Sequence, residues 1–118
     1  MNEEGLLKAL ADATRLRVVM LLQADELCVC DIVRVLGLPQ STVSRHIGRL
    51  REAGVVEARR TGTWMHYRLA DEPLLVELRG FFYRLRQVDP YWQDRLRLQE
   101  QVVCSPSPGG SAIESEED

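Results

Sequence analysis

The stretch "ELCVCDIVRVLGLPQSTVSRHIGRLREAGVV", residues 26–56, decides the fold of this chain. In its middle, Gly37 suits the left-handed end of a helix, and Pro39 is tolerated in a first helical turn. We therefore expect one short helix over 31–36 and a second over 40–53. The second helix carries an apolar stripe at helical spacing, formed by Val43, Ile47 and Leu50. Two short helices joined by a tight turn predict a helix-turn-helix.

The next stretch, "VVEARRTGTWMHYRL" at residues 55–69, has the pattern of a β-hairpin. Two strand-like runs, Val55–Arg59 and Trp64–Leu69, flank a loop over 60–63 that contains Gly62. A short extended piece is also expected at "LCV", residues 27–29. The predicted fold class is mainly α with a β-hairpin wing, a winged helix-turn-helix.

Helices are expected on both sides of this unit. Leucines and valines recur at helical spacing over 3–11 and 14–23, and Asp12 or Thr14 could cap the second of these helices. Pro73 opens a long amphipathic helix that reaches Leu85, and Asp89–Pro90 separates it from a last segment over 91–102. The apolar surfaces of the first helix and of the 74–85 helix exceed what so small a core can cover, which predicts a homodimer. Filling the monomer core is the alternative, and both uses are compatible.

The length and charge of the chain limit the classes of protein to which it can belong. The 118 residues suit one domain, which we place at 1–102, followed by a disordered acidic tail over 103–118 rich in Pro, Gly, Ser and Glu. The net charge of −3 becomes +1 when the four acidic residues of the tail are left out. Between residues 40 and 69, six arginines face two glutamates, which predicts a basic patch and a DNA partner. No secretory signal or membrane-spanning run is expected, and a cytoplasmic location follows by default.

The candidate DNA-contacting residues lie on the second helix of the helix-turn-helix and on the wing. Arginine pairs with guanine, glutamine pairs with adenine, and hydroxyls contact bases or phosphates. A polar stripe alone would also fit an ordinary solvated helix, but the adjacent turn and the basic hairpin favour double-stranded operator DNA. On the helix the residues are Gln40, Ser41, Thr42, Ser44, Arg45 and His46, with Arg49 and Arg51 placed on phosphates. On the wing they are Arg59, Arg60 and Thr63, placed over the DNA backbone or the minor groove.

Cys28 and Cys30 stand one residue apart just before the first helix of this unit. Free cysteines are often small buried hydrophobes, but closely spaced thiols in a reducing compartment more often act as ligands or reactive groups. If "LCV" is extended, residues 28 and 30 point to the same side, so both sulfurs can face one ion. Thiolates select soft ions, and a helix N-terminus stabilises the thiolate. The pair therefore predicts a soft-metal site.

Three segments, "LLKALADATRLRVVMLL", the 26–56 stretch and "RRTGTWMHYRL", together resemble the ArsR/SmtB family of metal-responsive repressors over about 6–69. "ELCVCD" is similar to the arsenite-sensing branch of that family. The resemblance implies a dimeric repressor that leaves its operator when arsenite or antimonite binds. It implies no enzymatic activity and no organic cofactor, and no Cys/His pairing in the sequence indicates a catalytic cysteine.

The chain departs from that branch in its third thiol. The branch often has a cysteine three residues beyond the pair, where this chain has Val33. We hypothesise a site of Cys28, Cys30 and Cys104, closed within one subunit or across a dimer. The alternatives are a two-thiolate site that also suits methylarsenite, a cadmium or lead sensor, a thiol-redox repressor, and a pure protein-interaction module using the acidic tail.

Overall fold

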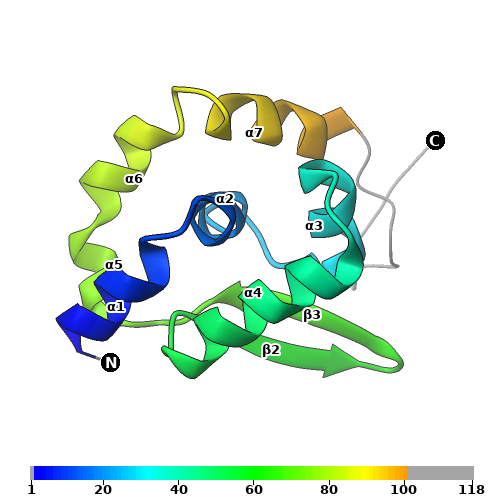
Figure 1. The fold of residues 1–118 in the computed structure, drawn as a ribbon, viewed down its shortest axis with the longest axis horizontal. Helices are drawn as coiled ribbons and strands as arrows, with labels where there is room; N and C mark the ends of the chain where they lie inside the picture. Colours follow the sequence, from blue (N-terminus) through cyan, green and yellow to red (C-terminus); the bar gives the residue numbers. More distant parts are fainter. Residues whose placement is uncertain (1, 101–118) are drawn as a thin grey trace.

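The computed structural model describes residues 2–100 of the chain (Figure 1). This range contains seven helices and three strands. Their bounds are α1 Glu3–Leu10, α2 Ala13–Leu21, β1 Leu27–Cys28, α3 Val29–Leu36, α4 Gln40–Glu52, β2 Val56–Thr61, β3 Trp64–Leu69, α5 Pro73–Glu77, α6 Arg79–Leu85 and α7 Tyr91–Glu100. The predicted winged helix-turn-helix, mainly helical with a small sheet, is confirmed.

Helix α2 occupies the centre of the molecule. In Figure 1 it is seen end-on, with α1, α3, α4, α6 and α7 arranged around it. Its residues Val18 and Val19 are fully buried. Of the two caps expected from the sequence, Asp12 is the one used, since its carboxylate accepts the Arg15 N–H at 3.0 Å.

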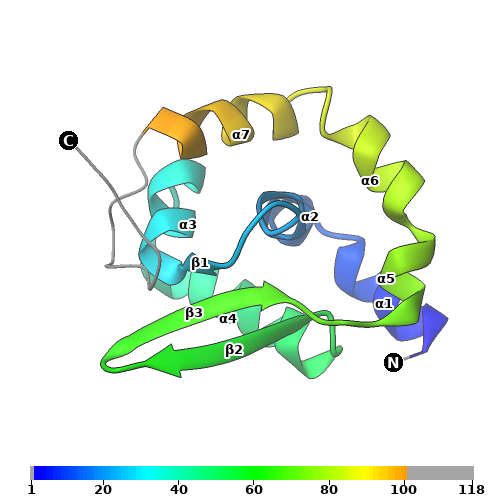
Figure 2. The ribbon, with the colours of Figure 1, turned by 180° about the vertical axis from the view of Figure 1, so that it is seen from behind.

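The sheet has three antiparallel strands in the order β1-β3-β2. The predicted hairpin pairs β2 with β3, from Val56 opposite Leu69 to Thr61 opposite Trp64, and leaves a loop of only Gly62 and Thr63. Gly62 has a φ of 64°, which a residue without a Cβ adopts freely. Strand β1 adds Leu27 and Cys28 to the other edge of β3, and Figure 2 shows this sheet lying over α4.

The turn of the helix-turn-helix forms as expected, but α3 begins two residues earlier than predicted, at Val29. Cys28 is its N-cap: the backbone is extended, and the sulfur accepts the Asp31 N–H at 3.4 Å. Cysteine is not among the residues that usually cap helices, so the sequence did not indicate this start. At the other end, Gly37 has a φ of 68° and donates its N–H to the Val33 carbonyl at 2.9 Å.

The prediction of one long helix from Pro73 to Leu85 is wrong. The structure divides it into α5 and α6 at Leu78, where φ is −91° and ψ is 6°. The Leu78 N–H bonds to the carbonyl of Leu75, three residues back, which tightens the chain and ends the α-helical pattern. Gly80, two residues further on, has weak helix propensity and does little to oppose the interruption.

The core gathers side chains from almost every element. Helix α3 contributes Ile32, α4 contributes Ile47 and Leu50, and α5 and α6 contribute Leu75 and Phe82. Within residues 2–100, no helix is both long enough and apolar enough to cross a bilayer. The predicted tail over 103–118 and the predicted end of the last helix at residue 102 lie outside the described residues.

Candidate nucleic-acid interface and thiol site

Helix α4 presents most of its predicted DNA-contacting residues to solvent. Val43, Ile47 and Leu50 are buried against the core, and this fixes the rotation of the helix. The opposite faces are therefore free to meet a groove. Gln40, Ser41, Ser44, Arg45, Arg49 and Arg51 are exposed, and Thr42 is half-buried.

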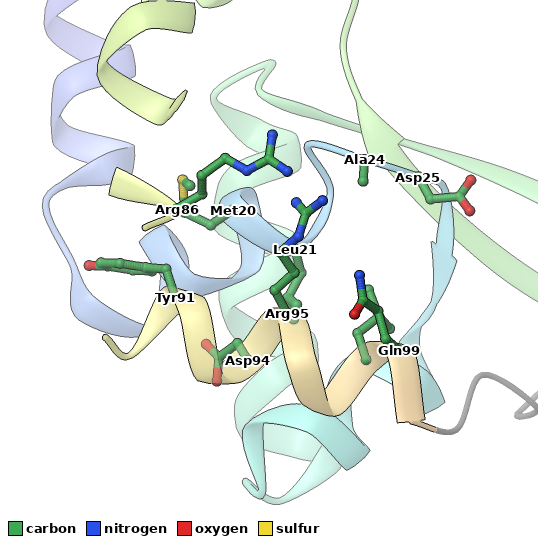
Figure 3. A pocket seen from close by; sticks show the side chains of 10 residues that line it. Met20, Leu21, Ala24, Asp25, Arg86, Tyr91, Asp94, Arg95 and Gln99 are labelled. Atoms are coloured by element: carbon green, nitrogen blue, oxygen red, sulfur yellow. The ribbon is translucent and has the colours of Figure 1, made fainter. Parts of the chain in front are cut away.

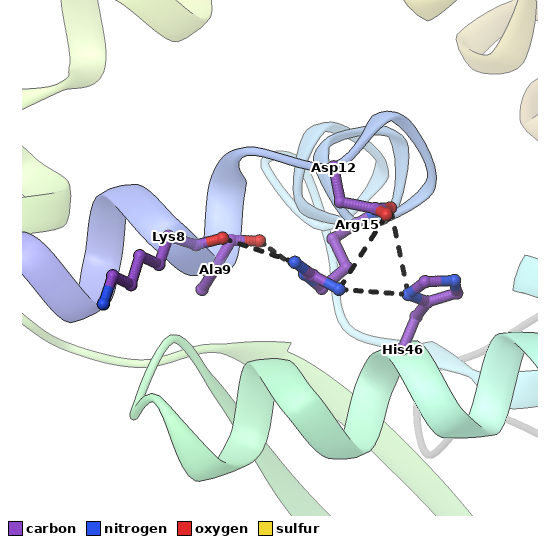
Figure 4. Close-up of polar contacts among 5 residues, drawn as sticks. All are labelled: Lys8, Ala9, Asp12, Arg15 and His46. Atoms are coloured by element: carbon purple, nitrogen blue, oxygen red, sulfur yellow. Dashed lines mark hydrogen bonds and ion pairs between the residues drawn. The ribbon is translucent and has the colours of Figure 1, made fainter.

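His46 differs from the other predicted contacts on α4. Its side chain is only 14% exposed and points toward the junction of α1 and α2 (Figure 4). Its Nδ1 lies 3.8 Å from an Asp12 oxygen and 3.4 Å from an Arg15 guanidinium nitrogen. Arg15 in turn donates to the carbonyls of Ala9 and Lys8 at 2.7 and 3.3 Å. This network ties the middle of α4 to the loop that joins α1 and α2.

Asp12 is the acidic centre of that network. The backbone N–H of Arg15 holds the pKa of Asp12 below its ordinary value. Burial opposes this shift, and the charges of His46 and Arg15 reinforce it. Sequence reasoning identified Asp12 as a candidate cap but did not connect it to the DNA-facing helix. That connection joins residues more than thirty positions apart, so only the folded chain reveals it.

The wing presents two of its three predicted residues freely. Arg60 and Thr63 are exposed near the tip of the β2–β3 hairpin. Arg59 is also exposed, but its Nε donates to Glu26 at 2.8 Å and its NH1 donates to the Thr61 hydroxyl at 2.7 Å. Glu26, which the sequence did not single out, thereby fixes the base of the wing against the turn before β1.

The structure brings Cys28 and Cys30 into contact. Their Sγ atoms lie 2.6 Å apart, with Cys28 at the end of β1 and Cys30 in the first turn of α3. The segment is therefore neither fully extended nor fully helical, and the change of conformation at residue 28 turns both sulfurs toward each other. The helix N-terminus beside them stabilises negative charge on sulfur. Two adjacent soft donors fit a thiophilic ion.

Two buried polar residues adjoin Cys28. The Asp31 carboxylate lies 3.4 Å from the Cys28 sulfur and receives an Arg34 N–H at 3.5 Å. His66 faces Cys28 across the β1–β3 pair, is 4% exposed, and its Nε2 has no hydrogen-bond partner among residues 2–100. Neither Asp31 nor His66 was predicted from the sequence to lie at the thiol site.

The described part of the chain supplies two thiols to this site and no complete metal cage. Across residues 2–100, no group of three or more His, Cys, Asp or Glu side chains is arranged to hold a metal ion. Cys104, the third predicted ligand, lies outside the described residues. Helix α7 packs against α3, however, and Arg34 of α3 donates to the Arg97 carbonyl of α7 at 3.3 Å (Figure 2).

The comparisons identify the family. The model described as "Bacterial regulatory protein, arsR family" matches residues 12–58. A homodimeric winged helix-turn-helix domain from Mycobacterium bovis, a possible ArsR-family transcriptional regulator, is 33% identical with a TM-score of 0.58, over 73% of this chain and 83% of that one. This chain belongs to the arsR family. That family consists of regulatory proteins, in agreement with the expectation that the chain is not an enzyme.

Curated relatives in the arsR family carry several names. The "Arsenical resistance operon repressor" of Escherichia coli is 50% identical over 66 residues, 55% of this chain and 56% of the relative. The "Arsenic resistance transcriptional regulator ArsR1" of Pseudomonas putida is 48% identical over 55% of this chain and 52% of its own length. The cadmium resistance regulator CadC of Listeria innocua is 39% identical over 53% of this chain and 54% of its own length. The matches therefore span little more than half the length of these relatives.

A solved structure extends the likeness beyond the matched helices. Reduced HlyU from Vibrio cholerae has a TM-score of 0.63 and 30% identity over 74% of this chain and 87% of that chain. The fold of this arsR-family chain thus recurs over most of the described residues.

Proposed function

We propose that this chain is a transcriptional repressor that binds operator DNA as a homodimer and is released by trivalent arsenic or antimony. The observation that carries the proposal is the contact between the Cys28 and Cys30 sulfurs at the N-terminus of α3. This places a pair of soft donors on the helix that supports the DNA-facing helix. Two relatives named for arsenic resistance are 48% and 50% identical to this chain over 66 residues, and they support the choice of inducer.

Binding of an ion at the thiol pair can change the position of α4 through α3. Each As–S bond forms as a thiol proton and an arsenic hydroxyl leave together as water. Cys28 is held in β1 by pairing with β3, whereas Cys30 lies in α3. When an ion binds both sulfurs, α3 is therefore the element that has to move. Ile32 and Val35 of α3 pack in the same core as Val43 and Ile47 of α4. A shift of α3 therefore changes the seating of α4 in the groove.

Cys104 is proposed as the third ligand. Helix α7 packs against α3, the thiol-bearing helix, and Glu100 is its last described residue. Cys104 follows Glu100 by four positions, and a fully extended chain of four residues reaches at most roughly 13–14 Å. A two-thiolate site remains the alternative if Cys104 does not take part.

The test is fluorescence anisotropy of the reduced full chain on an inverted-repeat duplex, titrated with arsenite. Wild type should bind and then dissociate, while Cys28→Ser and Cys30→Ser should bind the same duplex and ignore arsenite. Cys104→Ser should respond only at much higher arsenite if it is a ligand, and should respond like wild type if the site has two thiolates. Wild-type binding that is insensitive to arsenite would refute the assigned inducer.

A thiol-redox repressor is the second candidate, favoured by the same contact between the two sulfurs. In that case an oxidant such as hydrogen peroxide accepts the two electrons released when the thiols join, giving water, and DNA is released without metal. Peroxide and arsenite arms on the same duplex separate the two functions. Cadmium serves as a third arm, because a cadmium resistance regulator is among the relatives.

The DNA contacts are tested by salt dependence. Arg45→Gln and Arg49→Gln on α4 and Arg60→Gln on the wing should each weaken operator binding. A variant that loses a phosphate contact should also lower the slope of log affinity against log salt by about 0.9. Exposed Arg84 on α6 lies on another element, and Arg84→Gln should leave both affinity and slope unchanged.

A further inference from the structure

A cavity of about 200 Å³ lies between α2 and α7, and its lining includes neither thiol of the pair and no residue of α4 (Figure 3). Met20 and Leu21 of α2 and Leu98 of α7 supply its apolar lining, and Tyr91 closes one side. Ala24, in the turn after α2, stands at the rim with a small side chain that leaves the opening clear. The cavity thus combines an apolar lining with an open rim.

Two arginines reach toward this cavity without acidic partners. Figure 3 shows the guanidinium groups of Arg86 and Arg95 extending over the same opening, from the end of α6 and from α7. Both side chains are half-buried, and within residues 2–100 neither forms an ion pair with Asp or Glu. The Arg86 guanidinium lies over the face of the Tyr83 ring, 5.8 Å from its centroid. The site is thus electropositive without internal compensation.

The acids that line the cavity are already engaged or turned away. Asp94 is 1% exposed, and its oxygens receive two Arg17 N–H groups at 2.7 and 2.8 Å and one from Arg97 at 3.1 Å. Asp25 is exposed at the rim, and its Oδ1 accepts the backbone N–H of Glu26 at 2.8 Å. Neither carboxylate neutralises Arg86 or Arg95.

We infer that this cavity binds a small organic anion, a carboxylate carrying a compact apolar group. A guanidinium presents paired N–H donors that match a carboxylate, and the lining of Leu21 and Leu98 suits an apolar body. The volume lies below the roughly 300–1,000 Å³ typical of drug-sized ligands, which restricts the occupant to the size of benzoate or a short-chain fatty acid. The inference does not depend on the proposed arsenite response.

Occupancy would strengthen the attachment of α7 to the rest of the chain. Without a ligand, α7 is held by the Arg17–Asp94 ion pair to α2, by the Arg34 contact to α3 and by the packing of Tyr91 and Leu98 against the core. A ligand that bridges α2 and α7 binds the folded state alone and so raises the melting temperature with its concentration. At a hundred times its Kd, a rise of roughly 10 °C is expected for a domain of this size.

The test uses the reduced full chain, with sodium benzoate and sodium hexanoate as probes and ¹H–¹⁵N spectra as the readout. Saturable shifts are expected at Leu21, Ala24, Tyr91 and Leu98. Arg95→Gln should weaken benzoate binding at least tenfold, and Ala24→Phe should block it. Arg84→Gln, exposed on α6 and outside the cavity, should bind as wild type does. Benzamide, of the same shape without the charge, should bind at least tenfold more weakly.

Three results would overturn the inference. The first is the absence of saturable shifts at these residues with either carboxylate at millimolar concentration. The second is equal benzoate affinity for wild type and Arg95→Gln. The third is inorganic phosphate binding as tightly as benzoate, which would show plain charge attraction instead of an amphipathic site.

Discussion

Asp94 is the residue whose removal should cost most outside the apolar core. It is 1% exposed and receives a bidentate pair of N–H donors from Arg17. That hydrogen bond raises the pKa of the Arg17 guanidinium, which therefore stays charged at any ordinary pH. Asp94→Asn leaves this charge, itself only 21% exposed, without its partner and should lower the free energy of unfolding by about 2–4 kcal/mol in urea titrations.

Arg97→Gln is the matched control, because Arg97 touches the same carboxylate from a half-exposed position. Exposed ion pairs are worth little, so this variant should lose less than about 1 kcal/mol. A loss for Asp94→Asn that is no larger than the loss for Arg97→Gln would show that the buried pair does not hold α7 to α2.

Asp12 gives the chain a specific acid sensitivity. The Arg15 N–H holds the pKa of Asp12 below its ordinary value of 3.8, so its stabilising effect is complete above 3.8 and is lost as pH falls through the lower folded value. Asp12→Asn keeps a capping oxygen without the titration. Its free energy of unfolding should therefore fall less steeply than that of wild type between pH 4 and pH 2.

Asp71→Asn, at an exposed position outside any helix, is the control for that pH series. Its stability curve should run parallel to that of wild type. If the stability curve of Asp12→Asn also ran parallel to that of wild type, the carboxylate of Asp12 would not contribute to the loss of stability at low pH.

At the scale of elements, the two glycines of the helix-turn-helix should respond in opposite ways to alanine. Gly37 has a φ of 68°, where a Cβ is strained even though no atom lies within 4 Å of it. Gly48, inside α4, also has open space but ordinary helical geometry. By urea denaturation, Gly37→Ala should cost about 1 kcal/mol and Gly48→Ala should gain about 0.5–1 kcal/mol.

Gly48→Asn is the control, because it adds a side chain at the same position without the helix propensity of alanine. This variant should be less stable than Gly48→Ala. The prediction for α4 fails if Gly48→Ala is less stable than wild type. If Gly48→Ala is more stable but binds operator DNA more weakly, the backbone at residue 48 approaches the duplex.

The helix-turn-helix and wing were predictable because local signals there agree with the fold. Gly37 ends α3, the Val43–Ile47–Leu50 stripe buries one face of α4, and Gly62 closes the hairpin. The start of α3 was missed because a cysteine sulfur caps it, and the break at Leu78 was missed because no proline marks it. Neither feature has a strong signal in residue type.

Within the candidate site, only the contacts between residues close together in the sequence were predictable. The contact of Cys28 with Cys30 follows from a spacing of two residues. The pairing of His66 with Cys28, the Glu26–Arg59 bond and the link from His46 to Asp12 join distant segments. Register and packing create those contacts, and no pattern in one sequence specifies them.

At the scale of the whole molecule, large apolar side chains remain uncovered along α1, α5, α6 and the start of α7. Figure 1 shows α1, α5 and α6 side by side at one edge of the molecule. Half or more of the surface of Phe81 and Tyr83 is exposed. Several exposed large apolar side chains on neighbouring elements are typical of an interface. The exposed large apolar side chains on α1, α5 and α6 are Leu7, Val76, Phe81 and Tyr83, and those of the following loop and the start of α7 are Val88 and Trp92.

Phe81→Glu should therefore convert a dimer into a monomer in sedimentation velocity. A charge at this half-exposed position is readily solvated in the monomer, so the circular dichroism spectrum should be unchanged, while operator affinity should fall at least a hundredfold because two half-sites are no longer bound together. Trp64→Glu, an exposed aromatic on the wing, should stay dimeric and serves as the control. A Phe81→Glu variant that sediments with wild type would place the dimer interface on another face.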